Sequence, residues 1–268
     1  MEKKITIKDV AKMAGVSVAT VSYVINDRTD QRISEETKKR VLQIINLMDY
    51  RPNSSAKSLA TKKTFNISLC LSKEDSLLKR SEQLLMIQAL TTTLKEHGYH
   101  LYIQDNQDIT NLGYVDAILA FDVSEDYFSK IGDTNFVPVI AIDIAVGSDL
   151  CFLFFQVCTN YKKIYSVAYS HFGNDSFTYL CLKPNSSKLE SLIKSFFPSI
   201  RFIEDVNDLL NLPVSNYVYH HESFRPFLKE NPFSLYVKND MNKKANKIFQ
   251  CFEYAQNRVT VDEHLYYV

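Results

Sequence analysis

The sequence predicts two structural units in one chain, an all-α head followed by a larger α/β body. Apolar residues recur at helical spacing through about the first fifty residues, whereas short apolar runs alternate with amphipathic stretches beyond Thr64. The charges divide at the same place: residues 1–64 carry 13 Lys and Arg against 7 Asp and Glu, and residues 65–268 carry 18 against 24. The zero net charge of the 268-residue chain is therefore a cancellation. A basic end on an acidic body is expected where only that end meets a polyanion.

Composition excludes several classes of protein. With 46% apolar residues the chain is too hydrophobic for intrinsic disorder, and its five cysteines are too few for a disulfide scaffold. No two cysteines form a Cys-x-x-Cys pair, so we expect buried, reduced thiols in a reducing compartment. No apolar run approaches the ~20 residues of a membrane helix, and no signal peptide opens the sequence. We therefore expect a soluble cytoplasmic protein with no membrane partner.

Enzymatic motifs are absent from the sequence. The six glycines never fall as Gly-x-Gly or Gly-x-Ser-x-Gly, which excludes the dinucleotide fingerprint, the phosphate loop and the nucleophile elbow. The one cluster that resembles metal ligands is His220-His221-Glu222, and adjacent residues rarely point at one ion. We therefore expect no catalytic residues, no cofactor and no metal.

The first helix is predicted to open at Thr6, a hydroxyl N-cap with the carboxylate of Asp9 three residues on. Its apolar face consists of Ile7, Val10, Ala11 and Ala14. Gly15 supplies the backbone freedom of a tight turn, and Ser17 is placed to cap a second helix over residues 18–26. Two short helices joined by a glycine turn form a helix-turn-helix.

The outer face of the second helix distinguishes a DNA-binding motif from a small helical domain with an accidental glycine turn. This face carries short hydrogen-bonding groups rather than the Lys and Glu mixture of an ordinary solvated helix. They are Ser17, Thr20, Ser22, Tyr23 and Asn26. Such groups suit contact with phosphates and base edges in a major groove, and the basic charge of the head agrees with that. We therefore expect double-stranded DNA as a partner.

A third helix is predicted to begin at Ser34 and to end before Pro52, and a hinge helix of about eight residues follows from the cap Asn53. The hinge carries Lys57, Lys62 and Lys63. A helix this short is marginal alone, so we expect it to become ordered against DNA or against its copy in a second subunit. Leu59 on this helix suits an apolar wedge in a minor groove.

The head resembles the LacI family of bacterial transcriptional regulators over about 60 residues. The stretches that carry the resemblance are Thr6 to Ala11, Ala14 to Ser22, Ile33 to Thr37, Tyr50 to Asn53 and Ala56 to Leu59. The resemblance implies a homodimer on a near-palindromic operator. It also implies three parts: a helix-turn-helix DNA-binding head over 1–52, a hinge helix and linker over 53–64, and a sensor and dimerisation domain over 65–268.

The resemblance also implies which residues contact DNA. Val18, Ala19 and Tyr23 would face bases, and Tyr23 stands where family members commonly carry a basic or imidazole side chain. Leu59 would be the wedge that kinks the centre of the site, with Ala56 and Lys57 beside it. The residues expected near the backbone or the groove edges are Thr6, Ser17, Thr20, Ser22, Asn26, Arg32, Tyr50 and Asn53.

The body alternates strands with helices, which argues for parallel sheets covered by helices. Strands are predicted over 65–71, 100–104, 116–121, 137–142, 177–182, 216–219, 234–237 and 264–267, and helices over 81–97 and 243–254. The resemblance implies a two-lobed fold like a periplasmic sugar-binding protein, with an effector in the cleft between the lobes.

The second lobe departs from the family pattern. Only 204 residues follow the head, fewer than the family's usual sensor, and the shortfall falls between about 158 and 215. Pro184-Asn185-Ser186-Ser187 stands where Arg-x-x-Gly-Phe is usual, and Thr159-Asn160, Gly173-Asn174 and residues 218–222 also depart. The lost positions supply charged groups that grip sugar hydroxyls in relatives. We therefore expect a reduced second lobe that has lost sugar binding or changed its ligand, and we assign no effector-binding residues.

Residues 152–155 (Phe-Leu-Phe-Phe) could stack on a ligand, line a dimer interface or form an ordinary core strand, and we favour the strand. The leading hypothesis is a sequence-specific DNA-binding transcriptional regulator, more a repressor than an activator because the family mostly occludes promoters. One alternative is a ligand-binding α/β protein whose head tethers it non-specifically to DNA. A weaker third is an enzyme built on the α/β body.

Overall fold

The computed structural model describes residues 5–26, 28, 30–51, 58, 61–104, 110–147, 150 and 154–268. The chain divides into two compact units, Met1–Lys63 and Thr64–Val268, which are described separately. In the part of the chain that the structure describes, no helix is long and apolar enough to cross a membrane.

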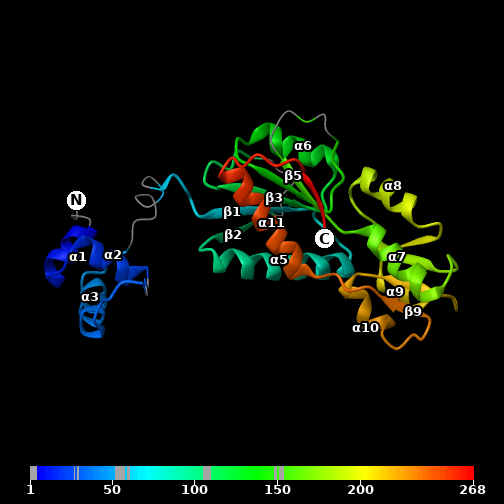
Figure 1. The fold of residues 1–268 in the computed structure, drawn as a ribbon, viewed down its shortest axis with the longest axis horizontal. Coiled ribbons are helices and arrows are strands. Elements are labelled where there is room, and N and C mark those ends of the chain that lie inside the picture. Colours follow the sequence, from blue (N-terminus) through cyan, green and yellow to red (C-terminus); the bar gives the residue numbers. More distant parts are fainter. Residues whose placement is uncertain are drawn as a thin grey trace. The chain divides into compact units, whose positions relative to one another are not determined.

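The head consists of three helices, α1 (Ile7–Ala14), α2 (Val18–Ile25) and α3 (Glu35–Leu47), as predicted (Figure 1). Its core is small and aliphatic. The buried residues are Val10, Ala11, Ala14, Val21, Val24 and Val41. Gly15 ends α1 with φ 64°, in the left-handed region, where a side chain would strain the backbone. A glycine therefore sets the turn between the first two helices.

The first lobe of the body is built on a six-stranded sheet (Figure 1). The strands are β1 (Asn66–Leu71), β2 (His100–Gln104), β3 (Ala117–Phe121), β4 (Val139–Ile142), β5 (Phe154–Cys158) and β10 (Leu265–Tyr267). They run in the order β10-β5-β4-β3-β1-β2, and every pair is parallel. Parallel sheets need both faces covered, which is why these strands are almost continuously apolar.

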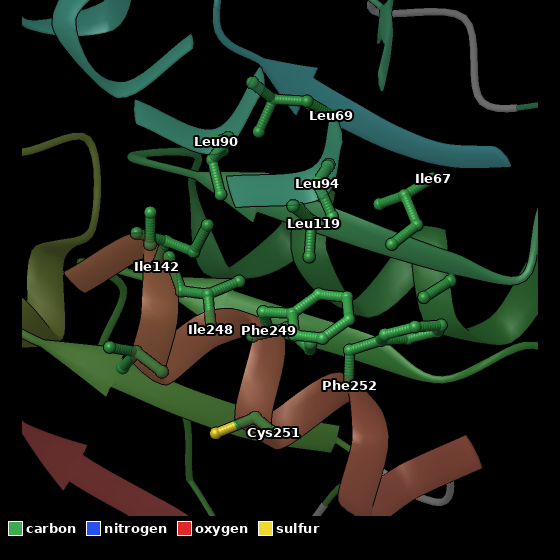
Figure 2. Packing of buried hydrophobic residues seen from close by; sticks show 14 of the residues in the cluster. Ile67, Leu69, Leu90, Leu94, Leu119, Ile142, Ile248, Phe249, Cys251 and Phe252 are labelled. Atoms are coloured by element: carbon green, nitrogen blue, oxygen red, sulfur yellow. The ribbon is translucent and has the colours of Figure 1, made fainter. Parts of the chain in front are cut away.

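Helices cover both faces of this sheet. On one face α5 (Leu77–Glu96) and α11 (Met241–Gln256) bury a core that includes Ile67, Leu119 and Phe252, and Figure 2 shows these side chains meeting between strand and helix. On the other face α6 (Glu125–Thr134) packs Phe128 and Ile131 against the strands. Because α5 and α11 lie about 150 residues apart in the sequence, this face of the first lobe is covered by distant segments of the chain.

The second lobe is a four-stranded parallel sheet in the order β7-β6-β8-β9. Its strands are β6 (Thr178–Leu182), β7 (Ile200–Ile203), β8 (Tyr217–Tyr219) and β9 (Ser234–Tyr236). One face packs against α7 (Tyr161–Phe172) and α8 (Ser187–Phe196). The other packs against α9 (Val206–Leu210), η1 (Glu222–Phe224) and α10 (Arg225–Leu228). The chain enters this lobe after β5 and leaves it before α11.

Most predicted elements are confirmed, with shifts of a few residues at their ends. The helix expected over 81–97 begins earlier, at Leu77, and the helix expected from 243 begins at Met241. The sequence did not predict α6, α7, α8, β7 or α9, which the structure supplies. The second sheet has four strands where the first has six. Phe154 and Phe155 belong to β5, as favoured, whereas 152–153 lie outside the described residues.

The cysteines that the structure describes are free and buried, as expected. They are Cys70, Cys158, Cys181 and Cys251, and Cys151 lies outside the described residues. Burial raises the pKa of Cys70 to about 11, so its thiol stays protonated and unreactive at neutral pH.

Candidate nucleic-acid interface

Helix α2 presents one buried face and one open face. Val21 and Val24 are buried in the head's core, which fixes the rotation of the helix about its own axis. The rest of its surface is available: Val18 is 40% exposed and Ala19 is exposed, while Tyr23 is half-buried. The three residues expected to face bases therefore lie on the outer side of one anchored helix.

Hydrogen bonds inside α2 hold its polar side chains in defined positions. The Ser17 hydroxyl oxygen accepts from the Thr20 N–H at 3.0 Å and lies 2.9 Å from the Thr20 hydroxyl. At the other end, the Asn26 side-chain amide donates to the Ser22 carbonyl at 2.8 Å. Ser17 thus satisfies the helix N-terminus, as its predicted capping role requires. Either hydroxyl can be the donor in the Ser17–Thr20 contact, and the Asn26 amide nitrogen also lies 3.4 Å from the Ser22 hydroxyl oxygen.

Arg28 is a candidate that the sequence reasoning missed. Its guanidinium lies 5.9 Å from the centre of the Tyr23 ring and pairs with Asp30, at 2.7 Å from Nε to Oδ1. This hydrogen-bonded pair lowers the pKa of the Asp30 carboxyl far below its usual value. A basic residue directly after the expected recognition helix was the available signal. The structure places Arg28 beside Tyr23, which is predicted to face bases, and a phosphate there could compete with Asp30 for the guanidinium.

The other predicted DNA-contact residues are dispersed over the head. Thr6 caps α1, and both its N–H and its hydroxyl donate to the Asp9 carboxylate, at 2.9 and 2.6 Å. Arg32 is exposed, and Tyr50 is half-buried against the head's core. The hinge residues predicted to contact DNA lie outside the described residues; they are Asn53, Ala56, Lys57 and Leu59.

A second candidate site is the cleft between the lobes of the body. It lies where the strands of both sheets end at their carboxyl termini, the usual position for a ligand in open α/β folds. Asp122 follows β3, Asp143 follows β4, Lys183 follows β6 and His220 follows β8, and all four line the cavity. Its volume is about 60 Å³. Ligand pockets usually measure about 300–1,000 Å³.

Buried charges lie in this cleft and directly behind it. Lys244 is fully buried, with its Nζ 2.7 Å from Oδ2 of Asp143 and 2.8 Å from the Thr159 hydroxyl. Burial raises the pKa of Asp122 to about 6, although Lys79 Nζ lies 3.5 Å from its carboxylate. Among the residues described, no group of three or more His, Cys, Asp or Glu side chains could hold a metal ion.

These features define a class of protein: a helix-turn-helix unit with a hydrogen-bonding recognition face, joined to a two-lobed parallel α/β unit. The lac repressor dimer bound to operator and the anti-inducer ONPF shares this fold, with a TM-score of 0.60 and 14% identity. The match covers 99% of this chain and 96% of that chain.

Sequence comparison leads to the same class. Residues 6–53 match the family model of bacterial regulatory proteins, lacI family. Catabolite control protein A of Streptococcus mutans is 49% identical over 67 residues, 25% of this chain and 20% of that protein. The probable HTH-type transcriptional repressor ExuR of Bacillus subtilis is 31% identical over 147 residues, 52% of this chain and 43% of that protein. The head is thus similar in sequence to this family, and the likeness in fold extends over the body. The chain spans less than half the length of these two relatives.

Proposed function

We propose that this chain is a sequence-specific DNA-binding transcriptional regulator, a repressor that binds a near-palindromic operator as a homodimer in the bacterial cytoplasm. The observation that carries the proposal is the construction of α2. Val21 and Val24 anchor one side of the helix in the core, and the opposite side presents Val18, Ala19 and Tyr23 among hydroxyl and amide groups. An anchored helix with such a face is the geometry that major-groove recognition requires.

In this mechanism the residues of the head divide into two roles. Val18, Ala19 and Tyr23 read base edges, and Arg32 with Arg28 contacts phosphates, which position the head without reading sequence. The backbone and groove-edge set is completed by Thr6, Ser17, Thr20, Ser22, Asn26, Tyr50 and Asn53. Residues 53–64 act as the hinge, where Ala56 and Lys57 accompany the Leu59 wedge in the minor groove. The chain acts by occupying DNA and not as an enzyme.

The homodimer forms in this proposal along the β2 edge of the first lobe. Strand β2 ends the order of the six-stranded sheet, and Tyr102 and Ile103 on it are 45% and 50% exposed. Leu84 of the neighbouring helix α5 is 54% exposed, and Tyr114 lies with its ring 6.1 Å from that of Tyr102. An exposed apolar sheet edge is a template for pairing, and a second copy of the chain would cover it.

Selection of binding sites from random DNA duplexes tests the proposal with the full-length chain. We expect a near-palindromic consensus bound at least ~10³-fold more tightly than unrelated duplexes. Tyr23→Ala should relax the preference at one base pair of each half-site. Arg32→Ala should weaken binding to all sequences alike and reduce the salt slope by about one.

A matched control is Lys39→Ala, which removes one positive charge from an exposed position of a different helix, α3. This variant should select the same consensus as the wild type. If selection returned no consensus and affinity followed salt alone, the head would be a non-specific tether on a ligand-binding α/β protein, and the proposal would be wrong.

A further inference from the structure

The loop that follows β6 fastens the second lobe to the first. The Asn185 side-chain amide donates to the Ser72 hydroxyl at 2.8 Å and to the Asp122 carbonyl at 2.8 Å. Its backbone N–H donates to the Asp122 carboxylate at 2.9 Å, and its side-chain oxygen accepts from Lys79 Nζ at 3.1 Å. One asparagine of the second lobe is therefore surrounded by partners from the ends of β1 and β3 and from α5 of the first.

Directly beside this contact, a carboxylate of the first lobe occupies the N-terminus of a helix of the second. Oε1 of Glu125, the first residue of α6, accepts from the Lys188 N–H at 2.7 Å and from the Ser186 hydroxyl at 2.8 Å. Its Oε2 accepts from the Ser187 N–H at 3.3 Å. These N–H groups open α8, and a helix N-terminus has free donors and a positive dipole end that favour an anion.

The charge state of Glu125 agrees with this geometry. Burial alone would raise the pKa of its carboxyl, but the hydrogen bonds from Lys188, Ser186 and Ser187 outweigh burial and hold the pKa below its usual value. The group is therefore ionised at neutral pH, as an anion at a helix N-terminus must be to contribute fully.

Three further contacts join the lobes on the side of α5. The Ser76 hydroxyl donates to the Glu204 carbonyl at 2.8 Å. Oε1 of Glu82 accepts from the Ser223 N–H at 2.8 Å, and its Oε2 lies 3.8 Å from Nδ1 of His221. The contacts between the lobes thus begin at the α6–α8 side of the cleft and continue along α5. The cavity at the carboxyl ends of the strands measures about 60 Å³, and two hollows of about 580 and 460 Å³ border Asn185.

From these contacts we infer that Glu125 and Asn185 form a clasp that keeps the lobes of the body closed on each other without a small-molecule effector. On the second lobe the clasp involves Asn185 and the start of α8. Asn185, Ser186 and Ser187 belong to the segment Pro184–Ser187, which is expected from the sequence to depart from the pattern of the family. The body then acts as a constitutively closed dimerisation unit. This inference goes beyond the proposed DNA-binding function, and it is tested without DNA.

The distance between two spin labels in the full-length chain measures lobe closure. Labels at Lys130→Cys on α6 and Lys194→Cys on α8 report across the clasp, with Cys151→Ser added because the other cysteines are buried. We expect one narrow distance distribution, unchanged by a panel of sugars and sugar phosphates. The variant Glu125→Ala/Asn185→Ala should shift the distribution to longer values and broaden it.

Two variants keep the test decisive. Asp126→Asn neutralises the exposed carboxylate next to Glu125 in the same helical turn and should leave the distribution unchanged. Glu125→Gln keeps the shape of the side chain and should open the lobes partly, which covers the case in which the double variant fails to fold. A wild-type distribution that is broad and narrows when a sugar is added would overturn the clasp. So would distances unchanged in both Glu125→Gln and a folded double variant.

Discussion

Lys244 is the most deeply buried charge that the structure describes in the body. Its side chain is fully buried on α11, and it reaches across to Asp143, which follows β4, and to the Thr159 hydroxyl. A buried ion pair adds little net stability over an apolar replacement of the same size, but a buried charge that loses its partner is costly. The pair therefore holds α11 against the six-stranded sheet, because moving the helix away would leave a buried charge without its partner.

Lys244→Met should lower the free energy of unfolding of the body by about 3–5 kcal/mol, because it removes the cation that lies 2.7 Å from the Asp143 carboxylate. Adding Asp143→Asn should restore a large part of that loss. Asparagine keeps the oxygen that accepts from the Thr159 N–H at 2.8 Å, and it tolerates the positive φ of 50° at this position. Urea unfolding followed by circular dichroism measures both variants, and equal losses in the single and double variants would contradict this account.

The residue-level features that sequence analysis found are the local ones. The capping of α1 by Thr6 and of α2 by Ser17 could be predicted, because each capping residue and its hydrogen-bond partner are three positions apart in the sequence. The Lys244–Asp143 pair could not, since its members are separated by 101 positions and either would be typical of a solvated surface.

At the level of elements, α2 is a short helix that depends on its ends. It has eight residues, fewer than an isolated helix needs, so its cap and its two buried valines hold it in place. The same hydroxyl that caps the helix belongs to the proposed DNA interface. Stability and recognition are therefore coupled at Ser17.

Ser17→Ala should destabilise α2 by about 0.5–2 kcal/mol, the usual cost of removing a hydroxyl N-cap. Hydrogen exchange of the α2 amides in the full-length chain should become faster by about 2- to 30-fold, which is this free energy expressed as a ratio of rates. Ser22→Ala, on the same helix but not at its N-cap, serves as the control. It should change the free energy of opening that hydrogen exchange measures by less than about 0.5 kcal/mol. Equal acceleration in both variants would show that the cap is not the cause.

The β2 edge gives a prediction for assembly. Ile103→Asp places one carboxylate from each subunit in the proposed interface, so the dimer dissociation constant should rise at least ~10-fold, equivalent to about 1.4 kcal/mol. Operator affinity should fall with it, since two linked heads bind more tightly than one. Phe136→Asp, at a 95% exposed apolar residue elsewhere on the body, is the matched control. Sedimentation equilibrium should show dissociation for Ile103→Asp alone.

The elements that could be predicted from the sequence were mainly those buried on both sides. The central strands β1, β3 and β4 are buried on both faces and stood out in the sequence as apolar runs. Helices such as α7, with residues Tyr161–Phe172, mix tyrosines with lysines and did not show a clear apolar stripe. Their helical state rests on packing against β6 and β8, which local sequence does not reveal.

For the whole molecule, the Glu82–His221 pair links lobe closure to pH. Burial alone would lower the pKa of His221, but Cys181 and the Glu82 carboxylate outweigh burial and raise the pKa to about 9. A histidine with a raised pKa contributes stability that is complete below its unfolded pKa of about 6.5 and is lost as pH rises through 9. The pair therefore stabilises the closed body at neutral pH and not in alkali.

His221→Gln should reduce the fall in stability between pH 7 and pH 10, by at most about 3 kcal/mol given a shift of between two and three pKa units. His171→Gln, at an exposed histidine in the last turn of α7, should retain the pH dependence of the wild type. The measurement is the free energy of unfolding at each pH. Identical pH profiles for His221→Gln and the wild type would rule out this role for the pair.

By itself the sequence determined the head: three helices, their caps, the glycine turn and the hydrogen-bonding face of α2. These follow from residues a few positions apart, whose geometry is dictated by the helix that contains them. Only the tertiary structure decided the clasp between the lobes and the charges buried behind it. Glu125 meets Lys188 across 63 positions and Glu82 meets Ser223 across 141, and a contact over such separations exists only once both lobes have folded and packed.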